Sequence, residues 1–263
     1  MGSLKKLAGQ TAWYGVSNIA ARLLTFLLTP YLTNMLTGEK GHIVYGQYGY
    51  LYSVFPIMNV VYTYGMETSF FRFSMTEDRT KLYRTQVTSM LFSTLIFSLL
   101  LWIFRSPLSV FAEIKDHVEY VGWCAVIIGL DALSALPYAR LRKDNRPRKY
   151  AATKVAGIIV FVFTIVFLFS FGSGFTRGNE NSAFARWYHC HWGLGFILFA
   201  NILQAIVTLA LLFGELKDFR PTFDKAIFRK VITYGYPILI AGFAGQTNDS
   251  LNRVMFLHLY PGP

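Results

Sequence analysis

Arg22 carries a charge within a stretch of apolar residues, 11–34, that is long enough to cross a bilayer. A charge at the bilayer centre costs about 2.5–3.5 kcal/mol on insertion scales, so such a residue is expected to face protein or water. A guanidinium binds phosphate oxygens through two parallel hydrogen bonds and stays charged. Asp131 occupies a later apolar stretch at a similar depth. We therefore expect Arg22 and Asp131 to share one aqueous cavity, as a pair or as ligand and gate. The alternative is a buried structural ion pair that holds the first and fourth helices together.

The last apolar stretch, 231–256, contains a dense run of polar residues. The run consists of Gln246, Thr247, Asn248, Asp249, Ser250, Asn252 and Arg253. A helix facing lipid does not tolerate so many polar groups, so this stretch must face a partner helix or an aqueous cavity. Asp249 and Arg253 are four residues apart, on one helical face, and can pair. We expect the substrate to meet Asn248, Asp249, Asn252 and Arg253.

Glu67 and Arg72 follow the second apolar stretch, 44–66, and are expected to form a local salt bridge at the mouth of the cavity. His189, Cys190 and His191 look like metal ligands. Adjacent residues of an extended segment point to opposite faces, and no fourth ligand is apparent, so we predict no metal and no cofactor.

The elements that position these residues are apolar segments of about 20 residues, the length that crosses roughly 30 Å of hydrocarbon. Hydrophobic residues make up 54% of the chain and charged residues 15%, against about 25% in soluble domains. The sequence predicts an all-α, polytopic membrane helical bundle of about seven transmembrane helices, at 11–34, 44–66, 86–104, 120–139, 155–171, 192–213 and 231–256.

The positive charge is distributed unevenly along the chain. If the N-terminus is cytoplasmic, most of the 25 Lys and Arg residues fall in inner loops, as the positive-inside rule requires. This topology explains the net charge of +11 without a nucleic-acid partner. The basic loop 140–150 is expected to meet anionic lipid headgroups. We predict a multi-pass protein of the cell inner membrane.

Three segments are expected. Residues 1–213 form a six-helix N-terminal lobe, 214–230 a cytoplasmic linker with a surface helix, and 231–263 the first helix of a C-terminal lobe. The connection 172–191 is expected to be a loop. Pro30, Pro56, Pro137 and Pro237 lie in expected helices, where they serve either as hinges of a transporter or as kinks that aid packing.

Three stretches resemble bacterial polysaccharide flippases of the multidrug/oligosaccharidyl-lipid/polysaccharide (MOP) exporter superfamily. Gly46-Gln-Tyr-Gly49, followed by residues 64–73 (YGMETSFFRF), resembles the second-span signature of the family. Residues 135–147 (ALPYARLRKDNRP) resemble the loop after its fourth span. Residues 234–253 resemble its seventh helix, where members often carry an Asp-Arg pair. Here Asn252 takes the place of that Asp, and Asp249 supplies an acid one turn earlier.

The resemblance implies a two-lobe transporter of 12 to 14 helices around a central cavity. This chain is expected to be its N-terminal half only, either as a fragment or as a half-transporter that dimerises. The implied function is alternating-access translocation of polyprenyl-diphosphate-linked oligosaccharide for cell-surface polysaccharide biosynthesis, with membrane lipids as the surroundings. Asp131 or Asp249 is a candidate carrier of a coupling cation, either a proton or sodium.

Two alternatives stay open on the sequence. Within the superfamily, an exporter of lipid II or of drugs has the same expected architecture. A membrane-embedded glycan-processing enzyme is the minor alternative, because the sequence shows no Asp-x-Asp motif, no His/Glu metal motif and no Ser-His pair at depth. The sequence therefore favours a protein that is not an enzyme.

Overall fold

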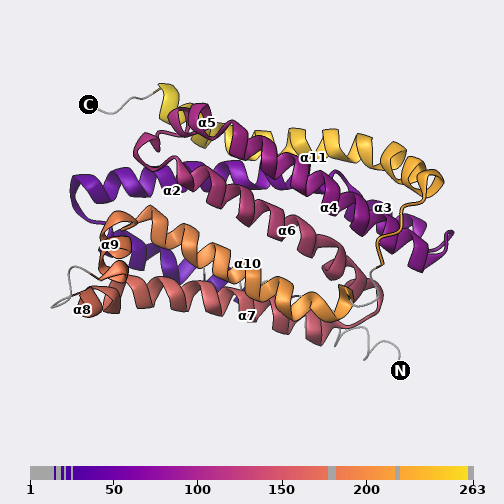
Figure 1. Cartoon of the computed structure of the whole chain (residues 1–263), viewed down its shortest axis with the longest axis horizontal. Helices are drawn as coiled ribbons and strands as arrows, with labels where there is room; N and C mark the ends of the chain where they lie inside the picture. Colours follow the sequence, from indigo (N-terminus) through magenta and orange to yellow (C-terminus); the bar gives the residue numbers. More distant parts are fainter. Residues whose placement is uncertain are drawn as a thin grey trace. The chain divides into compact units, whose positions relative to one another are not determined.

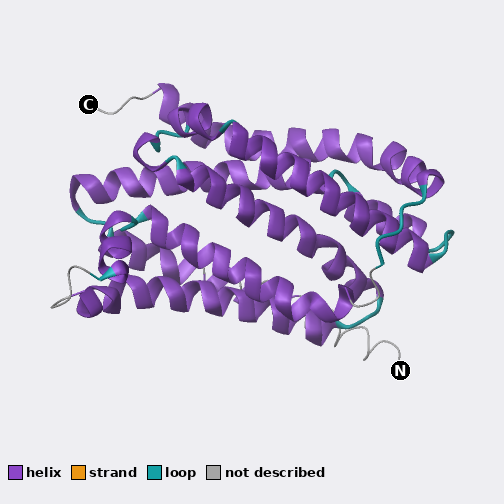
Figure 2. Cartoon of the chain, in the orientation of Figure 1, coloured by secondary structure: helices purple, strands orange, loops and turns teal. Residues whose placement is uncertain are grey.

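The structure is a computed structural model that describes residues 15, 19–20, 22–24, 26–176, 182–216 and 220–259. Residues 173, 175 and 249–259 are described by their backbone alone. The described part of the chain is helical and contains no strand (Figure 2), which confirms the all-α prediction.

The long helices that follow the first are α2 (Gly38–Thr63), α4 (Arg79–Ile103), α6 (Glu119–Lys143), α7 (Pro147–Val166), α10 (Leu194–Leu216) and α11 (Lys225–Leu259) (Figure 1). Shorter elements join them: α3 (Met66–Phe73), α5 (Arg105–Phe111), η1 (Lys115–His117), η2 (Phe167–Phe171), α8 (Gly172–Thr176) and α9 (Ala183–Cys190). Of these, η2 is a π-helical turn that prolongs α7. The first helix is described in part, with residues 26–35 continuous.

Four helices of the described chain are long and apolar enough to cross a membrane: α4, α6, α7 with η2, and α10. They coincide with four of the predicted spans. The other three predicted spans fall on the first helix, α2 and α11, and their passage through the bilayer stays a prediction.

The helix ends follow from local sequence. The carboxylate of Asp78 accepts hydrogen bonds from the backbone N–H groups of Thr80 and Lys81 at the start of α4. Ser182 caps α9 by accepting a hydrogen bond from the N–H of Ala185. Pro147 occupies the first turn of α7, where a missing N–H costs nothing.

The chain divides into two compact units. The first contains Met1–Tyr48 and Asn145–Leu211, and the second contains Gly49–Asp144 and Leu212–Pro263. The sequence predicted a different division: an N-terminal lobe (1–213), a linker (214–230) and the first helix of a C-terminal lobe (231–263). The two units do not test this division, so it stays a prediction.

In the first unit, hydroxyl groups and small residues join the helices. The Tyr31 hydroxyl lies 2.7 Å from Ser170 Oγ, and the Tyr188 hydroxyl donates to the carbonyl of Leu168 at 3.1 Å. Gly157 of α7 lies so close to α10 that a Cβ there would be 2.6 Å from Thr208 Oγ1. The predicted loop 172–191 includes α8 and α9. In α9, Tyr188 is buried and Trp187 is half-buried, whereas Phe184 is exposed.

In the second unit, α6 packs along α4, and α3 packs on both α6 and α11. The core contains large buried side chains from α2, α3, α4 and α6, among them Tyr62, Phe70, Leu82, Met90 and Leu136. The helix α11 begins at Lys225, so residues 225–230 of the predicted linker belong to this helix and residues 220–224 are not helical.

Candidate functional site

The two charges predicted to share a cavity lie in different units. Arg22 is an exposed helical residue of the first unit. Asp131 lies near the middle of α6 in the second unit and is half-buried. Among the described residues, no side chain pairs with its carboxylate. A cavity that contains both Arg22 and Asp131 stays a prediction.

Asp131 belongs to a definite face of α6. Residues 131, 135, 138 and 142 are spaced by four, three and four positions, so they line one face of the helix. Eleven residues of helix separate Asp131 from Arg142, which corresponds to about 16 Å along the axis. Arg142 near the helix end forms a salt bridge with Glu67 of α3. A single face of α6 therefore runs from an ion pair at the helix end to a carboxylate near the middle of the helix that pairs with no described side chain.

The partner of Glu67 differs from the one expected from the sequence. Glu67 pairs with Arg142, whereas Arg72 lies over the ring of Tyr234, 4.7 Å from its centroid. The physical reason is helical geometry: residues 67 and 72 are five positions apart on α3 and project from different faces. The proposed place of Glu67 and Arg72 at a cavity mouth stays a prediction.

A charged network that the sequence did not reveal lies at the same end of the second unit. Asp144 pairs with Arg79 and lies 3.8 Å from Arg140 Nε. Arg140 Nε also lies 3.8 Å from Glu215 Oε2, and its Nη1 donates to the Glu215 carbonyl at 2.7 Å. Glu215 is 3% exposed, so its charge depends on this partner. The Tyr83 hydroxyl donates to the same carbonyl at 3.2 Å.

A cavity of about 510 Å³ adjoins this network. Its lining comprises Phe70, Arg79, Thr80, Tyr83, Arg84, Arg140 and Asp144. The lining contains three arginines and one aspartate, so its net charge is positive and the cavity suits an anionic or strongly polar group. The spacing of Arg140 and Asp144 by four residues was visible in the sequence, but their contacts with Arg79 and Glu215 span 65 and 75 positions and required the fold.

The polar run of the last predicted span lies on α11, which continues through it to Leu259. Asn248 is exposed. The helical backbone places residues 248 and 252 on one face, and residues 249 and 253 on the next. The side chains of Asp249, Asn252 and Arg253 lie outside the described residues, so their contact with substrate stays a prediction.

Long apolar helices with charged clusters at their ends and a lone carboxylate at depth are typical of membrane transporters. The sequence profile of the polysaccharide biosynthesis protein family matches residues 7–263. The chain belongs to this family. This membership confirms the resemblance noted in the sequence. No curated protein and no solved structure matches the chain significantly.

Family membership and the four apolar helices together indicate a multi-pass membrane protein. Its role lies in polysaccharide biosynthesis and transport. Members of the family are mostly transporters, which favours transport over catalysis.

Proposed function

We propose that this protein translocates polyprenyl-diphosphate-linked oligosaccharide from the cytoplasmic to the outer leaflet of the inner membrane. The observation that carries the proposal is the family match over residues 7–263, almost the entire chain. The substrate combines a lipid tail with a diphosphate and a sugar chain, so its carrier needs both apolar walls and cationic groups within the membrane.

The charges at depth support this proposal. Arg22 supplies a planar, permanently charged donor suited to a diphosphate. Asn248, Asp249, Asn252 and Arg253 supply further polar groups along α11. The lobes rock alternately around the substrate, so that the cavity opens first to one face of the membrane and then to the other.

Asp131 supports the coupling of transport to a cation. Its carboxylate is half-buried in α6 and pairs with no described side chain. Binding of a proton or of a sodium ion neutralises the negative charge of a carboxylate within an apolar helix. We assign this coupling role to Asp131, with Asp249 as the second acid in the path.

The distribution of charge at the two ends of the second unit supports a cytoplasmic location for its cationic end. That end carries Arg72, Arg79, Lys81, Arg84, Arg140, Arg142, Lys143, Lys225, Arg229 and Lys230. The described residues of the opposite end carry Arg105, Lys115 and, on the far part of α11, Arg253, and Arg105 lies 4.9 Å from the ring of Trp102. The positive-inside rule assigns the first end to the cytoplasm, and an interfacial Trp suits the other.

Deletion of the native gene tests the proposal. We expect surface polysaccharide to disappear while the complete lipid-linked oligosaccharide accumulates, protected in spheroplasts from a glycosidase added outside. An incomplete oligosaccharide would instead indicate a glycan-processing enzyme. Accumulation of lipid II would indicate the related exporter. Unchanged surface polysaccharide without accumulation would refute a role in its export.

Restoration at the native locus separates the roles of individual residues. The wild-type gene should restore surface polysaccharide. The control is an Asp116→Asn variant, which changes an exposed acid of η1 and should restore it equally. An Asp131→Asn variant should not, at equal protein abundance in the membrane.

A further inference from the structure

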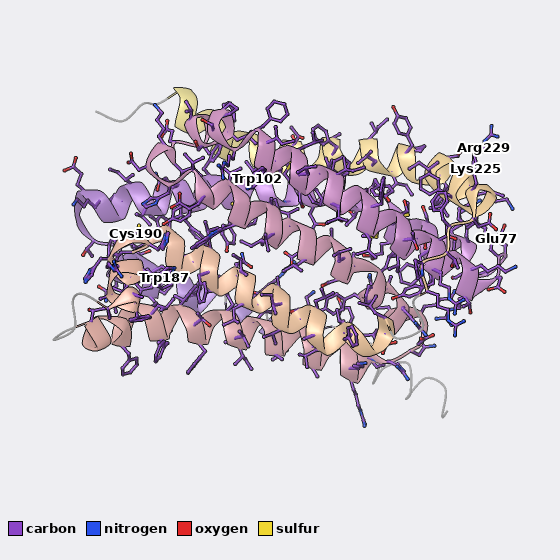
Figure 3. The ribbon with its side chains drawn as sticks, in the orientation of Figure 1. Glu77, Trp102, Trp187, Cys190, Lys225 and Arg229 are labelled. Atoms are coloured by element: carbon purple, nitrogen blue, oxygen red, sulfur yellow. The ribbon has the colours of Figure 1, made fainter. Side chains whose placement is uncertain are left out.

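A second charged feature of the second unit lies outside the network around Arg140. It is an open groove of about 880 Å³ between the end of α3 and the start of α11. We call it the α3–α11 groove and define it by Arg72, Phe73, Lys225, Ala226, Arg229, Lys230, Thr233 and Tyr234. Figure 3 shows Glu77, Lys225 and Arg229 together at this end of the unit.

The groove has a surplus of positive charge. The carboxylate of Glu77 beside it is engaged by the ammonium of Lys230 at 2.6 Å. Among the described residues, the side chains of Arg72, Lys225 and Arg229 pair with no carboxylate. Lys225 and Arg229 are four residues apart on α11, an arrangement in which like charges repel. An anion placed between them removes this repulsion.

The floor of the groove is aromatic. Phe73 and Tyr234 meet edge to face, with ring centroids 5.7 Å apart, and Arg72 lies over Tyr234 at 4.7 Å. The groove therefore combines an apolar floor with a cationic rim. This combination fits an amphipathic ligand better than a free ion, because a free ion makes no use of the floor.

On the predicted passage of α11 through the bilayer, the groove falls at the level of the lipid headgroups. The helix α11 has 35 residues, which corresponds to about 52 Å at 1.5 Å per residue, whereas the hydrocarbon core is about 30 Å thick. A helix of this length that crosses the bilayer extends beyond the core. The apolar part of α11 begins after Lys230, so its first residues, with Lys225 and Arg229, belong to the interface.

We propose that the α3–α11 groove binds the headgroup of an anionic phospholipid of the cytoplasmic leaflet. The phosphate contacts Arg72, Lys225 and Arg229, and the glycerol backbone lies against Phe73 and Tyr234. One lipid then links α3 to α11. This inference needs the membrane location of the protein and does not depend on which substrate is transported.

Native mass spectrometry of the purified full chain in detergent tests the inference, with phosphatidylglycerol as the probe and phosphatidylcholine as the uncharged comparison. Wild-type protein should retain phosphatidylglycerol preferentially. Loss of two groove charges in an Arg72→Gln/Arg229→Gln variant should weaken its affinity for phosphatidylglycerol about 30-fold. An Arg72→Lys/Arg229→Lys variant keeps the charges and should bind within a few-fold of wild type.

A matched control removes two charges from the same end of the unit, outside the groove. The Lys81→Gln/Lys143→Gln variant should bind phosphatidylglycerol like the wild type, and circular dichroism should show equal helicity in all variants. The inference is overturned if phosphatidylcholine is retained equally well, or if the control loses as much affinity as the groove variant. Displacement of the lipid by inorganic phosphate or by an acidic peptide, each at equal concentration, would assign the groove to a soluble anion or to a protein partner and would equally overturn it.

Discussion

Replacement of Gly65 by alanine should destabilise the second unit where α3 meets α11. Gly65 precedes α3 in a left-handed conformation, with φ of 72°. A Cβ at this position would lie 2.8 Å from the carbonyl oxygen of Gly235 and 3.0 Å from its Cα. Both neighbours are backbone atoms, so no side-chain rotation relieves the contact.

The expected loss combines two effects. An alanine in the left-handed region costs about 1–2 kcal/mol relative to glycine. Insertion of a methyl group into a closely packed contact costs a further 1–3 kcal/mol or so. The free energy of unfolding should therefore fall by roughly 2–5 kcal/mol, which corresponds to a decrease in Tm of about 5–15 °C.

Thermal unfolding in detergent, followed by intrinsic fluorescence, measures this loss. Two glycines without neighbours within 4 Å serve as controls: Gly49 in α2 and Gly245 in α11. Because alanine is the better helix former by about 0.5–1 kcal/mol, Gly49→Ala and Gly245→Ala should leave Tm unchanged or raise it. A Gly235→Ala variant introduces a methyl group into the same contact from the side of α11, because its Cβ would lie 2.8 Å from the Tyr64 carbonyl oxygen.

The reasoning fails if Gly65→Ala unfolds at the wild-type temperature. It also fails if Gly49→Ala and Gly245→Ala lower Tm as much, because the loss would then reflect glycine replacement in general and not the contact between α3 and α11.

Three further predictions concern charged residues. The N–H of Lys81 lowers the pKa of Asp78 below its ordinary 3.8, so its capping contribution is present at neutral pH and is lost as the pH falls through that lowered pKa; an Asp78→Asn variant should show a weaker decrease of Tm in acid. A double-mutant cycle with Glu67→Gln and Arg142→Gln should give a coupling energy of about 0.2–1 kcal/mol, since both side chains are about a third exposed and solvent screens the pair; a coupling near zero would remove this link between α3 and α6. An Arg22→Lys variant should reduce export of surface polysaccharide severalfold and Arg22→Ala should abolish it, because lysine lacks the bidentate fork; full export by Arg22→Ala would end the assignment.

The helices are predictable because their signal is local. Runs of about 20 apolar residues mark, in the sequence alone, the four helices that are long and apolar enough to cross a membrane. Asp78 and Pro147 mark two helix starts in the same way. The segment 172–191 differs from the predicted loop. Its glycine and asparagine residues favour a loop locally, whereas in α9 the buried ring of Tyr188 packs against the rest of the unit. Tyr188 lies near Phe196, with ring centroids 4.8 Å apart, a contact that local composition does not reveal.

The polar contacts are predictable only where partners are close in sequence. The sequence suggests that Glu67 pairs with Arg72, its neighbour along the chain, but the fold supplies Arg142 instead. Glu215 and Arg140 meet only because the end of α10 reaches the end of α6. Family membership follows from patterns spread over the whole chain and does not require these contacts.

The two units have a consequence for the order of synthesis. The first unit draws on residues up to Tyr48 and then on Asn145–Leu211, with the first part of the second unit between them. At about 5–20 residues per second, the ribosome needs roughly 5–20 s to make the intervening stretch. During this interval the early helix cannot make the contacts of Tyr31 with the end of α7 and with η2. Chaperones or insertion factors of the membrane can therefore bind the early helix during this interval.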